Sequence, residues 1–243
     1  PAVALLPLPQ KNAPGCNNEY RRKIFVSCVL CETRKEKRFC PALHDRICAQ
    51  CCGEAREVTV DCPSDCVYLQ QAREHEKPRS GEELDPAALF PQVEVPRQFV
   101  YENEHLLVGL SFALAKSARA DRSLKDQDLI TALTAAARTY ETLANSGLHY
   151  QVSPGGLGQQ AILAEVEKTL KEYREVEQKH RGFSSLRDSD VLRALVFLVR
   201  MAHARTSGRP RSRALIDSLF AQFPEKESLI ETPESAPSRI IVP

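Results

Sequence analysis

Cysteine is confined to one end of this chain. All nine cysteines of the 243 residues fall between Cys16 and Cys66, and none follows. A segment that concentrates one reactive residue type has a chemical requirement that the rest of the chain lacks. We therefore expect at least two domains, a cysteine-rich one and a second one that folds without cysteine.

Eight of these cysteines have the spacing of metal ligands, with two CxxC pairs and one CxxxC pair. Two thiolates separated by two residues can bind one tetrahedral ion from a single turn of the chain. Disulfides are the weaker interpretation, because disulfide-rich secreted scaffolds do not usually carry a long cysteine-free domain. The sequence predicts two zinc ions, with the ligands Cys28, Cys31, Cys40, Cys48, Cys51, Cys52, Cys62 and Cys66.

The second half of the cysteine cluster resembles a treble-clef zinc module. Residues 48–53 resemble a zinc knuckle, the alternation at residues 57–60 indicates a strand, and Pro63 is typical of the first position of a helix. A treble clef takes two ligands from the knuckle and two from the helix start. This grouping assigns to one ion Cys48, Cys51, Cys62 and Cys66.

The other ion then requires a fourth ligand. The grouping leaves Cys28, Cys31 and Cys40, completed by Cys52 or by the competing His44. The spacing also resembles that of MYND-type and HIT-type fingers, in which ligands of two ions are crossed along the chain. The pairing of cysteines with ions therefore stays open at the level of sequence.

The run CPALHDRICAQCCGEAREVTVDCPSDCVYL, which starts at Cys40, resembles a cysteine pattern of uncharacterised bacterial proteins. The resemblance is confined to the cysteine-rich segment. It implies metal binding and a bacterial, cytoplasmic protein, and it implies no reaction.

Composition divides the rest of the chain. Some segments are rich in proline and have no hydrophobic period, and we do not expect these segments to form a core. The expected order is a flexible arm at 1–19, the cysteine-rich zinc-binding module at 20–77, a Pro-rich linker at 78–97, a helical bundle at 98–223 and a disordered tail at 224–243. The expected fold class is mainly α, with a small treble-clef-like module before an all-helical bundle of about five helices.

Apolar residues recur at helical spacing through the bundle segment. The expected helices cover residues 99–119, 123–146, 157–180, 188 onward and 212–223. Ser123 and Asp126 resemble a capping box, and Gly147 and Gly182 are expected to follow helix ends. The fourth helix is apolar nearly all round, which predicts the central position, whereas the charged second half of the third should project into water.

The charge pattern limits the partners. With 33 basic and 32 acidic residues, the whole chain has no strong attraction for nucleic acid or anionic lipid. No apolar run reaches the length of about 20 residues that spans a bilayer, and the first residues lack the basic start of a signal peptide. We therefore expect a cytoplasmic protein without a membrane partner.

The sequence favours a binding protein. Ions closed within four thiolates leave no catalytic position, and HExxH, GxSxG, Walker and GxGxxG motifs do not occur. The preferred function is a zinc-stabilised interaction or adaptor protein, which binds another protein or serves as an assembly subunit. One alternative is nucleic-acid binding by the basic segment 20–39. Another alternative is a redox function, carried out by an iron–sulfur cluster or by reactive thiols at Cys51 and Cys52.

Overall fold

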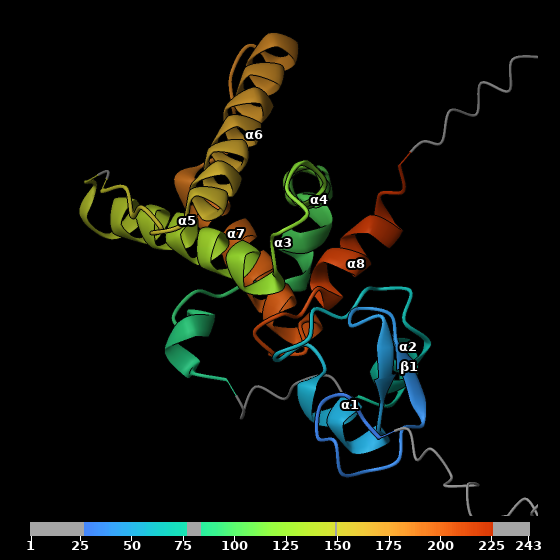
Figure 1. Cartoon of the computed structure of the whole chain (residues 1–243). Helices are drawn as coiled ribbons and strands as arrows, with labels where there is room; N and C mark the ends of the chain where they lie inside the picture. The colour runs from blue at the N-terminus through green and yellow to red at the C-terminus, as the bar shows by residue number, and fades with distance from the viewer. Residues whose placement is uncertain (1–26, 77–83, 149, 226–243) are drawn as a thin grey trace, which may run out of the picture.

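The structure, a computed structural model, describes residues 27–76, 84–148 and 150–225. The predicted arm at 1–19 lies outside these ranges, as does the predicted tail beyond residue 225. A small cysteine-rich part precedes a larger helical bundle (Figure 1), so the predicted fold class is confirmed. Among the described residues, every helix is too short or too polar to span a bilayer.

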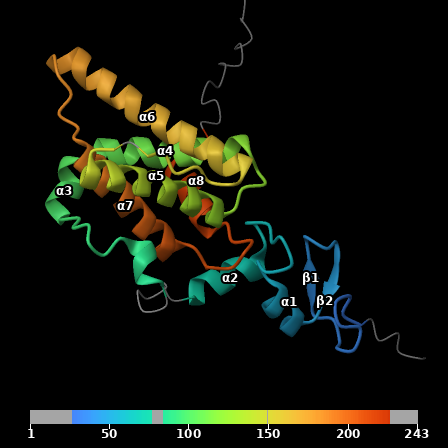
Figure 2. The ribbon, with the colours of Figure 1, turned by 90° about the vertical axis from the view of Figure 1, so that its left-hand side faces the viewer.

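The cysteine-rich part contains a hairpin and two helices. Strand β1 (Arg38–Cys40) pairs antiparallel with β2 (Asp45–Ile47), so that Cys40 stands opposite Asp45. Helix α1 (Ala49–Ala55) follows β2 directly, and α2 (Val67–His75) follows after a loop. Figure 2 shows these elements together at one end of the molecule, beside the bundle. We call residues 27–76 the cysteine module.

Two local predictions for this module are wrong. Residues 48–53 are not a knuckle before a strand, because they enter α1 with Cys48 at its N-cap. Residues 57–60 do not form a strand, since Glu57 adopts a left-handed backbone conformation with φ of 53°. One carbonyl oxygen, that of Ala55, accepts the N–H groups of the next turn, from Val58, Thr59 and Val60. These amides therefore need no neighbouring strand.

The start of α2 also differs from the prediction. The helix begins at Val67 with Cys66 at the N-cap, so Pro63 is not its first residue. Pro63 instead opens a turn in which its carbonyl oxygen accepts the N–H of Cys66. Cys62 and Cys66 consequently lie on either side of a turn, and they do not share a helix face.

Five helices form the bundle, as predicted. They are α4 (Glu104–Ala120), α5 (Asp126–Ser146), α6 (Leu157–Arg181), α7 (Asp188–Arg205) and α8 (Ala214–Gln222), preceded by the short α3 (Arg97–Glu102). Helix α7 packs against α4, α5 and α8, but α4 and α5 also each pack against at least three helices, so the predicted central position of α7 is not distinguished from theirs. The buried residues of α7 are Val191, Leu192, Ala194, Leu195, Val196, Leu198, Val199 and Ala202.

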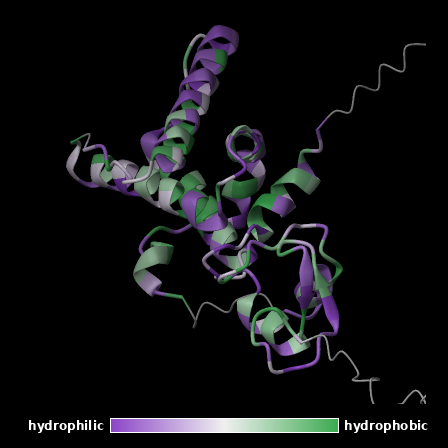
Figure 3. Ribbon diagram, in the orientation of Figure 1, coloured by the Kyte–Doolittle hydropathy of each residue, from purple (hydrophilic) through white to green (hydrophobic). Residues whose placement is uncertain are grey.

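Helix α6 extends beyond its neighbours, and its far half is hydrophilic (Figure 3). Its buried residues, at Ile162, Leu163, Val166 and Leu170, all precede the charged stretch at residues 171–181. Val176, in the second half, is 56% exposed. The prediction that this half projects into water is confirmed.

Two helices end at the predicted glycines, whereas the predicted start of one helix is wrong. Gly147 and Gly182 end α5 and α6 with φ of 67° and 80°, which only glycine adopts without strain. Helix α5 begins at Asp126, so the capping box at Ser123 is wrong. Ser123 instead donates its N–H and its hydroxyl to the carboxylate of Asp121.

The buried carboxylate of Asp126 caps a different helix. It is 1% exposed, and it accepts the backbone N–H groups of Leu215 and Ile216 at the start of α8, together with the Ser212 hydroxyl. Unpaired N–H groups at a helix start are costly when they are buried. One acidic side chain of α5 therefore fixes the position of α8.

The described part of the predicted linker lies against α7. A 3-10 helix η3 (Pro86–Leu89) precedes Phe90, which is 2% exposed in the core of the bundle. The Arg200 guanidinium donates to the carbonyl oxygens of Leu89, Phe90 and Val93. This segment is consequently part of the packed bundle.

A buried ion pair of the cysteine module, between Glu57 and Arg73, lies where the module meets the bundle and shares its polar groups with it. Glu57 is 1% exposed, and its carboxylate accepts hydrogen bonds from Arg73, at 2.8 Å, and from the Ser207 hydroxyl. The same Arg73 guanidinium donates to Asp217 of α8 at 2.6 Å, and the N–H of Arg211 donates to the Glu57 carbonyl oxygen. Module and bundle share these polar groups, which we call the joint.

Two contacts at the loop before α2 enlarge the joint. The Ser64 hydroxyl donates to the Asp217 carboxylate at 2.7 Å. Lys125, just before α5, forms an ion pair with Asp61 at 2.7 Å. The loop that carries Cys62 is thereby held against the bundle.

Candidate metal centre

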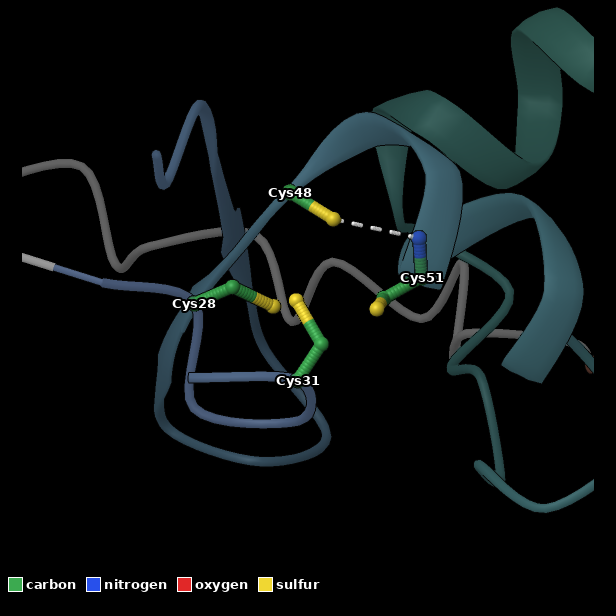
Figure 4. A group of neighbouring side chains, drawn as sticks. All are labelled: Cys28, Cys31, Cys48 and Cys51. Carbon is green, nitrogen blue, oxygen red and sulfur yellow. Dashed lines mark hydrogen bonds between the residues drawn. The ribbon is translucent and has the colours of Figure 1, made fainter. Parts of the chain in front are cut away.

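Four cysteine side chains converge on one point inside the cysteine module. The Sγ atoms of Cys28, Cys31, Cys48 and Cys51 all lie within 4.8 Å of one another (Figure 4). In a tetrahedral zinc site with Zn–S bonds of about 2.3 Å, neighbouring sulfurs are roughly 3.8 Å apart. Small rotations of these side chains would therefore be enough to bind one ion.

A tight loop presents the first pair. The N–H of Glu32 donates to the Cys28 carbonyl oxygen at 2.7 Å, and the N–H of Cys28 donates to that of Arg34 at 2.9 Å. Glu32 has φ of 56°, which turns the chain back on itself. Cys28 and Cys31 consequently point to the same side of the loop.

Helix α1 presents the second pair. Cys48 is the N-cap residue, and its sulfur accepts the backbone N–H of Cys51 at 3.3 Å. Hydrogen bonds and the positive end of a helix dipole stabilise a thiolate. The start of α1 thus directs a backbone N–H at the Cys48 sulfur.

The four-cysteine centre is largely buried and has one positively charged side chain beside it. Cys28, Cys48 and Cys51 are between 0% and 7% exposed, so water has little access to the centre. A four-thiolate zinc site carries a formal charge of minus two, which is costly in a buried place. Arg34 lies beside it, with its guanidinium 3.8 Å from the Cys48 sulfur, and it offsets part of that charge.

The thiols of the centre differ in their readiness to ionise. Hydrogen bonding by the Thr33 side chain, followed by backbone N–H groups of Arg34 and Thr33, lowers the pKa of Cys31 to about 6. Hydrogen bonding with the Cys48 sulfur, followed by burial, raises the pKa of Cys51 to about 12. Without an ion, Cys51 holds a proton between the other sulfurs. A cation would take the place of that proton.

The grouping expected for a treble clef is therefore wrong. Cys48 and Cys51 combine with Cys28 and Cys31, which precede them, rather than with Cys62 and Cys66. The reason lies in the hairpin, because the N–H of Val29 donates to the Arg46 carbonyl oxygen and brings the first loop beside the start of α1. Cys40 lies between the two pairs in the chain and does not belong to this group.

The other predicted ligands lie elsewhere in the module. Cys40 ends β1 and is buried, Cys52 follows Cys51 in α1, and Cys62 and Cys66 flank the turn before α2. His44, the competing ligand, is exposed in the hairpin turn. Cys16 lies outside the described residues.

The basic segment 20–39 is described only from residue 27. Two of its positive side chains have structural partners, because Arg34 lies at the metal centre and the Arg38 guanidinium lies 4.6 Å from the centre of the Tyr68 ring. Lys35 and Lys37 are exposed. Binding of nucleic acid here stays a prediction.

Sequence reasoning missed two kinds of residue. Arg34 was considered only as part of the basic segment 20–39, although its position three residues after a CxxC pair could have indicated a neighbour of the sulfurs. Glu57 was interpreted as a strand residue. No local signal identifies it as the buried carboxylate of the joint, since its partners are distant in sequence.

Comparisons with models of protein families, with curated proteins and with solved structures gave no match to this chain.

Proposed function

We propose that this chain is a zinc-stabilised interaction protein, which binds another protein or serves as a subunit of an assembly. The observation that supports this is the closed four-cysteine centre, in which four sulfurs within 4.8 Å can occupy all positions of a tetrahedral ion. Catalytic zinc sites keep one position for water or substrate, whereas structural sites do not. The ion would hold the module in shape without taking part in a reaction.

The spacing of the sulfurs favours one ion over a multi-iron cluster. An iron–sulfur cluster places several metal and sulfide atoms between its cysteines and holds the thiolates further apart than a single ion does. Zinc with a structural role is the assignment that agrees with this spacing.

The module offers apolar side chains to a partner. Val29 and Leu30, each 43% exposed, stand between the ligands Cys28 and Cys31. Binding of the ion would fix this loop and with it both side chains, which lowers the entropy lost on association. We call Val29 and Leu30 the loop tip. Reduced thiols are stable in a bacterial cytoplasm, which is the compartment that we propose.

Metal analysis of the full chain, purified without added metal, tests the first part of the proposal. Zinc in at least one equivalent per chain and no visible absorbance are expected. Iron with sulfide absorbance would replace the proposal by a redox function, and absence of metal, even after Zn²⁺ is offered to the reduced protein, would overturn it.

Site-specific crosslinking in living cells tests the second part. A photoreactive residue in place of Leu30 should crosslink one protein reproducibly, and the same residue in place of Leu157, which is 85% exposed on α6, is the control. The Leu30 product should vanish when Cys31→Ser removes a ligand. Crosslinks to nucleic acid, or identical products from both positions, would contradict a protein-binding loop tip.

A further inference from the structure

We infer that Cys40, Cys52, Cys62 and Cys66 form a second zinc site, and that this ion holds the joint between the cysteine module and the bundle. The inference rests on the proposed zinc chemistry of the first centre and extends it to the four remaining cysteines of the described module. These four line one cavity of about 20 Å³.

The cavity has the size and lining of a metal site. About 10 to 15 Å³, measured in the same way, accommodates one water molecule, so the cavity has room for one small occupant. The rest of its lining is mostly apolar, from Phe39, Ile47, Val60, Tyr68 and Leu69. Thiols are weak hydrogen-bonding groups, so the four sulfurs offer little to a water molecule. A soft cation suits four sulfurs better.

Neighbouring cysteines of α1 serve the two centres separately. Successive side chains on an α-helix point about 100° apart, because one turn takes 3.6 residues. Cys51 points to the first centre, and Cys52 therefore points away from it, into the cavity. The two sets are crossed along the chain, which was one of the arrangements left open by the spacing.

A second arginine repeats the arrangement at the first centre. The Arg56 guanidinium lies 3.8 Å from the Cys52 sulfur, just as that of Arg34 lies 3.8 Å from the Cys48 sulfur. Each set of four cysteines thus has one cation beside it. A group of neutral, purely structural thiols would have no need of such a charge, whereas a four-thiolate ion has a negative charge to offset.

The sulfurs of the second set are less closely grouped than those of the first set. Among the described residues, only the first set has sulfurs that all lie within 4.8 Å of one another. Side-chain rotation into the cavity would have to close the remaining distance, and the Cys66 sulfur is available for this because it makes no capping hydrogen bond to α2. Each protonated thiol that binds releases its proton to water, so four thiolates and Zn²⁺ give the charge of minus two.

The position of this site assigns its role. Cys62 and Cys66 flank Ser64, whose hydroxyl bonds to Asp217 of the bundle, and Cys62 follows Asp61, which pairs with Lys125. Cys66 also starts α2, the helix that carries Arg73 of the joint. The first ion would hold the loop tip, and the second would hold the surface that meets the bundle.

Metal counting on the full chain, reduced and supplied with Zn²⁺ alone, tests the inference. We expect two ions per chain in the wild type, one in Cys62→Ser, one in Cys31→Ser, and two in the control Cys16→Ser. One ion in the wild type, retained in Cys62→Ser, would overturn the second site and leave the proposed function intact. No ion at all would overturn both.

Alkylation of the metal-loaded wild type gives a result that does not depend on a variant's folding. Protection of all eight cysteines from an alkylating reagent, located by mass spectrometry, is expected. Modification of Cys40, Cys52, Cys62 and Cys66, with protection of the first set, would overturn the inference.

Hydrogen exchange then tests the assigned role. Cys62→Ser should increase exchange of backbone amides in α2 and around Ser207 at least tenfold, whereas Cys31→Ser should do so only in the first loop and the hairpin. The same pattern in both variants would show that neither ion acts on the joint by itself.

Discussion

The cysteine module and the bundle are stabilised by different means. The bundle buries leucine, isoleucine, valine and alanine around α7, and its core needs no other component. The buried residues of the module's own core are few, and four of them are cysteines, at Cys28, Cys40, Cys48 and Cys51. A domain of this size buries too small a share of its apolar surface to be stable unaided. If the proposed zinc is bound, it would supply to the module the stability that buried leucine side chains supply to the bundle.

Metal removal should produce the largest difference in stability between the module and the bundle. Structural zinc contributes about 10 to 16 kcal/mol in small zinc domains, more than a module of this size can replace by packing. A chelator should therefore unfold residues 27–76 while the bundle helices remain. Hydrogen exchange should show lost protection in α1 and β2 and unchanged protection in α7. Persistence of a protected module without metal would contradict the comparison.

A core truncation in the bundle should have the reverse pattern. Leu195 is 0% exposed on α7, so Leu195→Ala leaves a cavity and should lower the free energy of unfolding by about 3 kcal/mol. The metal content should not change. Urea unfolding and metal analysis measure both effects. Val176→Ala, at a residue 56% exposed, is the control, with a change within about 0.5 kcal/mol.

The joint should contribute less to the free energy of unfolding than the interior of the module or the interior of the bundle. Arg73→Met leaves Glu57, which is 1% exposed, without its ion-pair partner. Loss of one member of a buried pair costs about 3 to 5 kcal/mol, and we expect about 2 kcal/mol because the Arg73 side chain is 22% exposed. Hydrogen exchange should rise around residues 57 and 207, and metal content should stay constant.

An exposed ion pair on the bundle provides the matched control for the joint. Lys168 and Glu172, one turn apart on α6, are 57% and 61% exposed. Lys168→Met should change the free energy of unfolding by about 0.5 kcal/mol or less. Equal losses from Arg73→Met and Lys168→Met would show that the joint adds no more than a surface pair.

Apart from the control variants, the smallest expected effect depends on pH and belongs to the bundle alone. Burial by itself would raise the pKa of Glu177, but hydrogen bonds from the side chains of Ser185 and Ser184 and from the backbone of Leu186 and Ser185 lower it overall. The carboxylate therefore stabilises the folded state above its unfolded pKa of about 4.3. This contribution should be lost as pH falls from there through the lower folded value.

Glu177→Gln tests that contribution. The variant should lose about 1 kcal/mol of stability at pH 7 and show a smaller loss at acid pH than the wild type. Thermal unfolding of both proteins from pH 7 to pH 3 measures the difference. Parallel curves for the two proteins would contradict a stabilising role of the charged form.

Sequence reasoning succeeded where the signal is periodic or local. The apolar period predicted the five bundle helices, and glycines marked the ends of α5 and α6. It failed at the start of α5, because Asp126 caps α8, a helix almost 90 residues away in the chain, and not its own helix. A capping pattern within a few residues cannot show such a partner.

The sequence by itself determined that this chain contains a cysteine-rich segment with the spacing of metal ligands and a helical bundle, because residue type and period are properties of the linear chain. Only the tertiary structure decided which cysteines meet. The pairing of Cys28 and Cys31 with Cys48 and Cys51 depends on the hydrogen bond that brings the first loop to β2. The role of Glu57 was decided in the same way, since its partners come from α2 and the segment after α7. Ligand spacing limits which pairs can share an ion, and the path of the backbone selects among them.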